Sequence, residues 1–280
     1  MTEEKKNISL QMHAYNIRRY ALLMGEVQGQ GYIAQALGVS DMLAVTYFHA
    51  MKYKAEDPEW EGRDRFFLSN GHFAIAAYAV FIEAGILPED EYETYGSDDS
   101  RLPMSGMAQY TPGMEISGGS LGHGIGIAVG SCLALKRKKS NSFVYVMYSD
   151  GELNEGHTWE AAMSAAHHEI DNLIVMVDLN KQQADDHTQR VLDLGPIEEK
   201  FESFGWYTQR VNGNDIDELV IAFDNAKNLK DKKPRVILCD TKMAKGVPFL
   251  EEREKNHFLN VEPEEWEKAI QILDSNKPIA

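Results

Sequence analysis

An acidic residue and an amide residue stand at matching positions after two apolar, strand-like runs. Asp150 follows the run "FVYVMYS", and Asn180 follows the run "LIVMVDL", 30 residues further along the chain. With the backbone carbonyl of Gln182 they would offer three hard oxygen ligands, the set that suits Mg²⁺ or Ca²⁺ beside a phosphate group. Aspartate-glycine turns and asparagine after a strand are also common in plain loops, so the spacing alone leaves an ordinary turn as an equal alternative.

The two positions meet if the runs are parallel strands joined by a crossover helix. Such a unit takes about 30 residues, and the segment 158–168 between the runs has helical character. Asp150 and Asn180 would then lie together at the carboxyl edge of the sheet, where open α/β sheets bind their ligands. Gly151 would let the backbone approach a diphosphate closely, and the helix N-terminus would favour the same negative charge.

The rest of the chain also alternates between helical and strand-like segments. Further strands are expected at 206–211 and 235–240, and helices at 8–24, at 215–227 and, after a glycine-rich turn, within 115–139. Ser40 and Asp41 are expected to cap another helix that runs to about Lys52. The pattern predicts an α/β fold, a mostly parallel sheet with helices on both faces. No linker forces a boundary, so we expect one domain over 1–280 with a peripheral helical tail at about 261–280.

Composition argues against several classes of protein. The chain has 280 residues, 43% hydrophobic and 26% charged, and is expected to be soluble with a large core. Its net charge of -16 disfavours nucleic acid and anionic membranes as partners. The longest apolar run, Phe73–Ile82, is too short to span a bilayer, and no basic-then-apolar leader opens the chain. We expect a cytoplasmic protein, with Cys132 and Cys239 as buried, reduced thiols.

Five sequence blocks resemble the N-terminal domain of transketolases, which are thiamine diphosphate enzymes. "SDGELNEG" and, 30 residues after its aspartate, "DLNKQQAD" are similar to the thiamine diphosphate signature in its transketolase form. The other blocks follow in family order: "FLSNGH" (67–72), "TPGMEISGGSLGHGIGIAVG" (111–130), "VNGNDID" (211–217) and "TKMAKGVPFLEEREKNH" (241–257). The resemblance covers nearly the whole chain and implies the thiamine diphosphate-binding fold.

The resemblance implies a role for each matching residue at the cofactor. Mg²⁺ or Ca²⁺ would be held by Asp150, Asn180 and the Gln182 carbonyl, with the diphosphate bridging to it. The remaining cofactor contacts come from residues beside the signature aspartate and from the backbone that meets the aminopyrimidine: Gly151, Glu152, Gly119, Ser120 and Leu121.

Three further residues carry catalytic roles in this resemblance. His72 and His257 would contact the diphosphate end and the bound sugar, and Glu155 would support a glutamate contact between the two cofactor-binding domains. Without the blocks, each has an ordinary alternative, since loop histidines are usually structural and Glu155 would suit the first turn of a helix. A second set of titratable residues resembles a metal cluster only superficially and receives no role: His167, His168, Asp185, Asp186 and His187.

Two sugar-reading positions depart from the family pattern. Tyr32 stands where transketolases usually have a histidine of a Gly-His pair, and Ser105 stands where they have the histidine of Gly-His-Pro. The first glycine of the signature is Ser149, a small residue that should fit. Because the metal and diphosphate positions are kept while sugar-reading positions differ, we expect a ketol transfer with an altered sugar partner. The alternative is that the Tyr32 and Ser105 hydroxyls still bind the usual xylulose and ribose phosphates.

The resemblance also predicts a missing half. In transketolases a glutamate on a separate pyrimidine-binding domain activates the cofactor, and full-length chains continue through that domain and a C-terminal one. This chain stops at Ala280. We therefore expect the N-terminal subunit of a split transketolase, which transfers a two-carbon ketol unit between sugar phosphates only with a separate C-terminal subunit. The expected assembly has two copies of each chain.

Two rival interpretations remain open at this point. The chain would resemble a 2-oxo acid dehydrogenase α subunit or a deoxyxylulose phosphate synthase fragment in its signature, but "GSLGHG" (119–124) and the block ending at His257 favour transketolase. A non-catalytic regulatory partner that keeps the fold is the other alternative. The retained Asp150, Asn180, His72 and His257 argue against it.

Overall fold

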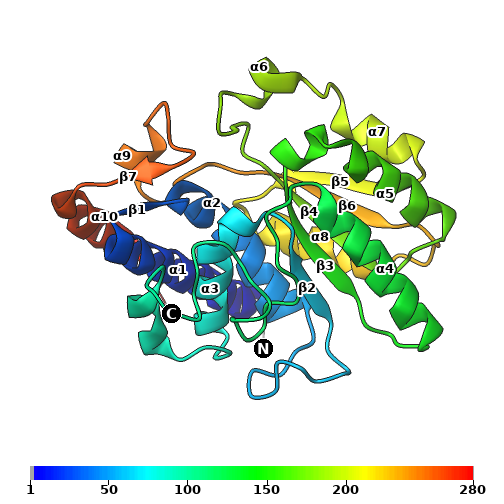
Figure 1. Cartoon of the computed structure of the whole chain (residues 1–280), viewed down its shortest axis with the longest axis horizontal. Coiled ribbons are helices and arrows are strands. Elements are labelled where there is room, and N and C mark those ends of the chain that lie inside the picture. Colours follow the sequence, from blue (N-terminus) through cyan, green and yellow to red (C-terminus); the bar gives the residue numbers. More distant parts are fainter. Residues whose placement is uncertain (1–2, 280) are drawn as a thin grey trace.

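The computed structural model describes the backbone of residues 3–279 and the side chains of residues 9–279. Within them, five parallel strands form a central sheet between two helical layers (Figure 1). The strand order is β2-β3-β4-β6-β5, with bounds β2 Arg65–Leu68, β3 Val144–Ser149, β4 Leu173–Leu179, β5 Tyr207–Asn212 and β6 Arg235–Asp240. The predicted α/β class with a parallel sheet is confirmed.

Both faces of the sheet are buried, because alternate side chains of each strand point to opposite helical layers. In β4, Ile174 and Met176 pack into one hydrophobic cluster, while Leu173, Val175 and Val177 pack into the other. This explains why the strand reads as a continuous apolar run rather than as an alternating one.

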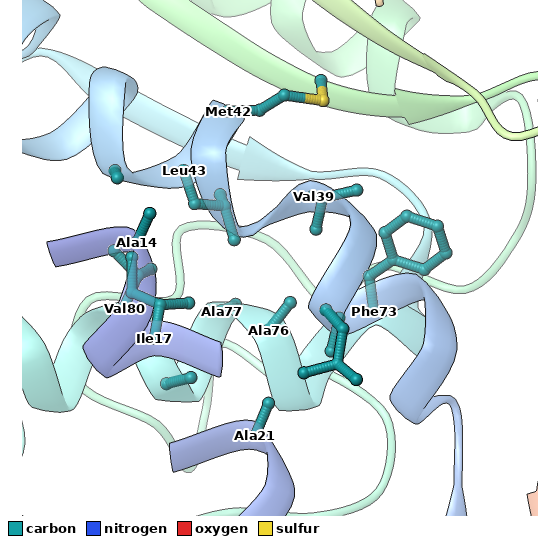
Figure 2. Packing of buried hydrophobic residues seen from close by; sticks show 14 of the residues in the cluster. Ala14, Ile17, Ala21, Val39, Met42, Leu43, Phe73, Ala76, Ala77 and Val80 are labelled. Atoms are coloured by element: carbon teal, nitrogen blue, oxygen red, sulfur yellow. The ribbon is translucent and has the colours of Figure 1, made fainter. Parts of the chain in front are cut away.

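Helices distant in sequence cover each face. The first layer contains α1 (Glu3–Gln28), α2 (Ile33–Val45), α3 (Ala74–Glu83) and α8 (Ile216–Asn228), and the second contains α4 (His123–Arg137), α5 (Gly156–His167) and α7 (Ile197–Ser203). Figure 2 shows small and branched side chains of α1, α2 and α3 meeting in the first layer, among them Ala14, Ile17, Leu43 and Ala77. Alanine at these positions lets the three helices approach closely.

The remaining elements are one further helix, a two-stranded sheet and several short helical turns. The predicted helical tail forms α10 (Pro263–Ser275), which packs against α1 through the buried Trp266. Two-residue strands β1 (Gln30–Gly31) and β7 (Leu259–Asn260) pair in an antiparallel manner near it. The remaining helical turns are η1 (Thr46–Ala50), η2 (Gly71–Phe73), η3 (Glu89–Thr94), η4 (Gly151–Asn154), α6 (Thr188–Leu192) and α9 (Pro248–Glu251).

The predicted helix cap at Ser40 and Asp41 is wrong. Both residues lie inside α2, which begins at Ile33. The Ser40 hydroxyl donates to the carbonyl of Ala36 (2.7 Å), and the Asp41 carboxylate is buried against Arg18 Nη1 (3.1 Å). Ser40 and Asp41 therefore find hydrogen-bond partners inside the helix, although in the sequence they resemble the residues that begin one.

Two elements near the site lack a periodic signal in the sequence and were not predicted. All four residues of β2 are buried, and α3 is buried from Ala74 to Ile82. A helix that is apolar on every side shows no amphipathic pattern. The two cysteines, Cys132 and Cys239, are free and buried as predicted. Across residues 3–279 we find no helix with the length and apolar character needed to cross a membrane.

Candidate cofactor and metal site

The carboxyl edge of the sheet opens into a cleft of about 530 Å³. A second hollow of about 440 Å³ adjoins it, and the two share His257 and the segment 182–185. The cleft is lined by eight residues to which the sequence assigns a site role: His72, Leu121, Asp150, Gly151, Glu155, Asn180, Gln182 and His257. The second hollow adds Tyr32. Most of the predicted site is therefore brought together at one edge.

Asp150 and Asn180 converge as the crossover predicts. The Asp150 backbone N–H donates to the carbonyl of Asp178 at the end of β4 (3.1 Å). Its carboxylate accepts from the N–H groups of Gly151 (2.8 Å) and Lys181 (2.9 Å) and from the hydroxyl of Thr188 (2.8 Å). These bonds fix a buried carboxylate beside the loop that carries the second predicted ligand.

The Asn180 amide is held at both ends. Its oxygen accepts from the Gln182 N–H (2.9 Å), and its nitrogen donates to the Asp178 carboxylate (2.7 Å). Within the described part of the chain, the Gln182 carbonyl accepts no hydrogen bond, so this oxygen is available to a ligand. The three predicted oxygen donors thus come from one short loop and the end of β3.

The charge at this edge fits a divalent cation. Asp150 and Asp178 are 2% and 1% exposed, and burial raises the pKa of Asp150 to about 6 and that of Asp178 to about 7, where the charge of Asp150 also contributes. Neither forms an ion pair with another described residue. The ammonium group of the nearby Lys181 lies 3.8 Å from the Asp240 carboxylate instead. Two buried carboxylates without a cationic partner are costly unless they take up protons or a cation balances them, so a divalent cation would stabilise their ionised forms.

Glu152 lies away from the cleft. Its side chain is fully buried, and its carboxylate accepts from the Ser69 hydroxyl and from the N–H groups of Gly122 (3.1 Å) and Ser149 (3.0 Å). Burial raises its pKa to about 7. The structure gives it a supporting position: it ties the glycine-rich turn to the ends of β2 and β3, and the predicted direct cofactor contact has no geometric support.

The glycine-rich turn lies on the end of β2. A Cβ atom on Gly118 would lie 2.3 Å from the Leu68 carbonyl oxygen, and the Gly119 N–H donates to the carbonyl of Ser69 (3.0 Å). Gly122 has φ +83°, and a Cβ there would lie 2.6 Å from that of Glu155. Only glycine permits this close approach, and of residues 119–121 it is Leu121 that lines the cleft.

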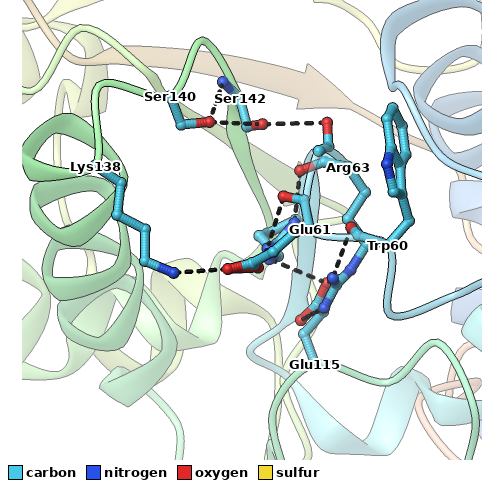
Figure 3. A network of polar contacts seen from close by, with 9 residues as sticks. Trp60, Glu61, Arg63, Glu115, Lys138, Ser140 and Ser142 are labelled. Atoms are coloured by element: carbon cyan, nitrogen blue, oxygen red, sulfur yellow. Dashed lines mark hydrogen bonds and ion pairs between the residues drawn. The ribbon is translucent and has the colours of Figure 1, made fainter.

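An ion-pair network fixes the segment that leads into this turn. Arg63 donates two hydrogen bonds to Glu115 (2.8 and 3.0 Å), in the parallel geometry of a guanidinium and a carboxylate. Glu61 accepts from Lys138 at the end of α4 (2.7 Å), as Figure 3 shows. The loop before β2 is thereby attached to both the turn and α4.

His72, His257 and Tyr32 form an aromatic cluster where the two hollows meet. The Tyr32 ring centroid lies 4.8 Å from that of His72 and 5.6 Å from that of His257. Burial and the neighbouring His257 lower the pKa of His72 to about 4, and burial also lowers the pKa of His257. Both imidazoles are therefore neutral near pH 7. The Nδ1 atom of His257 is buried without a partner.

Of three other predicted residues, Glu155 lines the cleft, whereas Ser105 and Ser120 line neither hollow. The Ser105 hydroxyl lies 3.5 Å from where a Cβ on Gly119 would be, which puts it beside the glycine-rich turn. Glu155 is exposed at the start of α5 and makes no capping hydrogen bond there. Ser120 is exposed next to Gly119. Groups that would face a partner are thus at the surface.

Several residues of the site were not predicted. Thr188 and Asp178 hold the predicted ligands, and Asn154 and Gln183 line the cleft with buried amide atoms that lack partners. Unsatisfied polar atoms of this kind suit a polar ligand. The one available signal in the sequence is Asp178, the single charged residue in the run "LIVMVDL".

Comparison with known proteins identifies the family. The family model described as "Transketolase, thiamine diphosphate binding domain" matches residues 11–277. The chain belongs to this family. It is 68% identical to an uncharacterized transketolase family protein of Sinorhizobium fredii, over 98% of this chain and 99% of that protein.

Two other matches define how much of a transketolase is present. The chain is 36% identical to the 6-deoxy-6-sulfo-D-fructose transketolase subunit SqwG of a Clostridium species, over 96% of this chain and 98% of that subunit. The solved transketolase from Leishmania mexicana superposes with a TM-score of 0.86 at 29% identity, and the match covers 96% of this chain but 41% of that one. The chain therefore corresponds to a whole transketolase subunit and to less than half of a single-chain transketolase.

Proposed function

We propose that this chain is the cofactor-binding subunit of a two-chain transketolase that binds thiamine diphosphate through Mg²⁺ or Ca²⁺ and uses a non-standard sugar. The transketolase family and the thiamine diphosphate-binding domain follow from the family match, and the full-length match to a transketolase subunit makes this a chain of the same kind. The metal, the sugar and the stoichiometry are the proposed parts.

The observation that carries the proposal is the convergence at the sheet edge. Asp150, Asn180 and the Gln182 carbonyl present oxygen atoms there, and the buried carboxylates of Asp150 and Asp178 have no cationic partner among the described residues. We assign these three residues to the metal, and the Gly151 backbone and the unpartnered Gln183 Nε2 donor to the diphosphate side. This donor set suits a hard divalent cation rather than zinc, which prefers histidine and thiolate.

Thiamine diphosphate, when bound, supplies the electron sink that stabilises the two-carbon fragment during its transfer. His72 and His257, neutral near pH 7, would offer hydrogen bonds to the diphosphate and the sugar. The backbone of Gly119, Ser120 and Leu121 would form one wall for the aminopyrimidine. Burial around His72 and His257 lowers the local dielectric constant and strengthens the hydrogen bonds that they would make.

The partner surface is proposed on the rim of the cleft. Val191 and Leu192 line the cleft and are 38% and 53% exposed, and exposed apolar residues of this kind favour association. Glu155 lies exposed on the same rim, ready to meet the partner's activating glutamate. We propose an assembly of two copies of this chain and two of a C-terminal subunit around a twofold axis. A cytoplasmic location remains a prediction.

The sugar is proposed to differ from the usual donors. Tyr32 packs against the two histidines with its aromatic ring, and the Ser105 hydroxyl lies beside the glycine-rich turn. Both replace the family histidine, so the pattern of hydroxyl groups that this side can bind changes. The relative from Clostridium is itself named for a modified fructose, which supports the expectation of an unusual sugar.

The direct test combines this chain with its partner. The purified chain should show no ketol transfer alone and should become active when co-expressed with the C-terminal subunit from the neighbouring reading frame. Activity would be measured with a panel of ketose donors in the presence of Mg²⁺ and thiamine diphosphate. Ketol transfer by the isolated chain would overturn the two-chain proposal, and a complex without activity on any ketose would favour a non-catalytic role.

A further inference from the structure

A buried carboxylate lies directly behind the proposed metal site, at the penultimate residue of β4. Asp178 is 1% exposed and is paired in register with Ser149 of β3 and Cys239 of β6. It is the first residue of the block "DLNKQQAD", but the sequence assigned it no role. A strand that is otherwise apolar would bury an aspartate at this point only at a cost, which asks for a reason.

Asp178 contacts two of the three residues assigned to the metal. Its carbonyl accepts the backbone N–H of Asp150 (3.1 Å), and its carboxylate Oδ2 accepts Nδ2 of Asn180 (2.7 Å). The other carboxylate oxygen, Oδ1, accepts the hydroxyl of Thr241, the residue directly after β6. Three neighbouring strands are thus connected at the point where the site begins.

The hydrogen bond to Asn180 decides which end of the amide faces outward. The ionised Asp178 carboxylate only accepts hydrogen bonds and the Gln182 N–H only donates them, so both turn the amide nitrogen toward Asp178. The amide oxygen is then left on the opposite side, where it accepts from the Gln182 N–H (2.9 Å) and keeps a free lone pair. Turned the other way, Asn180 would place an NH₂ group where a cation needs an oxygen.

Resting on the metal assignment proposed above, we infer that Asp178 is a positioning residue that holds the Asn180 amide with its oxygen toward the cation, and that Thr241 in turn orients Asp178. Residues in this second layer around a metal typically change its affinity about 10- to 100-fold when they are removed. Asp178 contributes no ligand atom of its own.

The test measures Mn²⁺ binding to the purified chain in the presence of thiamine diphosphate, by the electron paramagnetic resonance signal of free Mn²⁺. Asp178→Ala should weaken Mn²⁺ binding about 10- to 100-fold. Asp178→Asn keeps an oxygen that accepts from Asn180 and should bind within a few-fold of wild type. Circular dichroism shows whether Asp178→Ala folds. If it does not, Thr241→Val, which keeps the shape of the side chain, replaces it in the test and should weaken Mn²⁺ binding by an intermediate factor.

Asp240→Ala is the matched control. Asp240 ends the adjacent strand β6 at the same edge and pairs with Arg210 and Lys181, so its removal takes away a carboxylate without freeing the Asn180 amide. The inference would be overturned if the Asp178→Ala chain bound Mn²⁺ as tightly as the Asp240→Ala chain does. Equal losses in Asp178→Asn and Asp178→Ala would also overturn it, in favour of charge alone. Failure of the wild-type chain to bind Mn²⁺ would instead contradict the metal assignment.

Discussion

The two ends of the cleft are built differently. At the sheet edge, Asp150, Asn180 and Asp178 are joined by hydrogen bonds between neighbouring strands. At the sugar end, Tyr32 comes from the start of α2 and His257 from a loop that is tied to α2 by one hydrogen bond, from Gln35 to the His257 carbonyl (2.6 Å). The cofactor end depends on strand register, which a single substitution does not easily change. The sugar end depends on separate side chains on a helix start and a loop, where one residue can be replaced by another without altering the sheet.

The largest expected effect would break the cofactor end. Asp150→Ala should remove a charged ligand and weaken metal-dependent binding of thiamine diphosphate by more than about 100-fold, since even second-layer residues contribute about 10- to 100-fold. Asp185→Ala, an exposed carboxylate in the same cleft, is the matched control and should bind normally. Calorimetric titration measures both, and normal binding by a folded Asp150→Ala chain would refute the metal assignment.

The next effect separates the partner contact from the metal. Glu155→Ala should leave Mn²⁺ binding by the isolated chain unchanged but lower ketol transfer by the assembled enzyme about 30-fold or more, because losing one partner of a desolvated interface contact costs about 2 kcal/mol or more. Mass in solution and activity of the co-expressed complex are the measurements. If metal binding falls as much as activity does, Glu155 belongs to the cofactor end and not to the junction.

A smaller effect is expected at the sugar end. Tyr32→His combined with Ser105→His should improve use of xylulose 5-phosphate relative to the native sugar by about tenfold, because each unpaired buried polar group costs about 1 to 3 kcal/mol. Competition between the two donors in the assembled enzyme gives the ratio. If the wild-type enzyme already uses xylulose 5-phosphate at a rate ordinary for transketolases, altered specificity is wrong.

The smallest expected effect concerns the protonation of His72, which lies between the two ends of the cleft. His72 should titrate with a pKa of about 4 because of burial and the neighbouring His257. The unfolded chain binds the proton near pH 6.5, so this group makes the free energy of unfolding fall as the pH drops from 6.5 toward 4. NMR titration of the imidazole, assigned with His72→Asn, checks the value. A pKa near 6.5 would show that His72 is solvated rather than enclosed.

Much of the cofactor end could be predicted from the sequence. The crossover places Asp150 and Asn180 by strand register alone, and strands β4 and β6 begin and end where the apolar runs do. Asp178 was missed because its role depends on which atom of Asn180 it contacts, and spacing along the chain carries no such information. The burial of Glu152 could not be predicted for a related reason, since a motif position does not reveal whether a side chain points into the cleft or into the core.

The first helical layer was harder to predict. Residues of α3 are buried on nearly every side, which removes the amphipathic period on which helix prediction depends. Ser40 and Asp41 gave a false start because their partners, Ala36 and Arg18, satisfy them inside the helix. The positions of His72 and Tyr32 follow from these helices, so the closeness of their rings emerges only in the folded chain.

The central claim is that the carboxyl edge of the sheet holds thiamine diphosphate through a divalent cation. Calorimetric titration of the purified wild-type chain with thiamine diphosphate, with Mg²⁺ and then with Mg²⁺ removed by a chelator, tests it most directly. The account predicts one cofactor per chain with Mg²⁺ present and at least a tenfold loss of affinity without it, in keeping with the contribution typical of residues around a metal. Equal affinity in both titrations, or no binding in either, would contradict it.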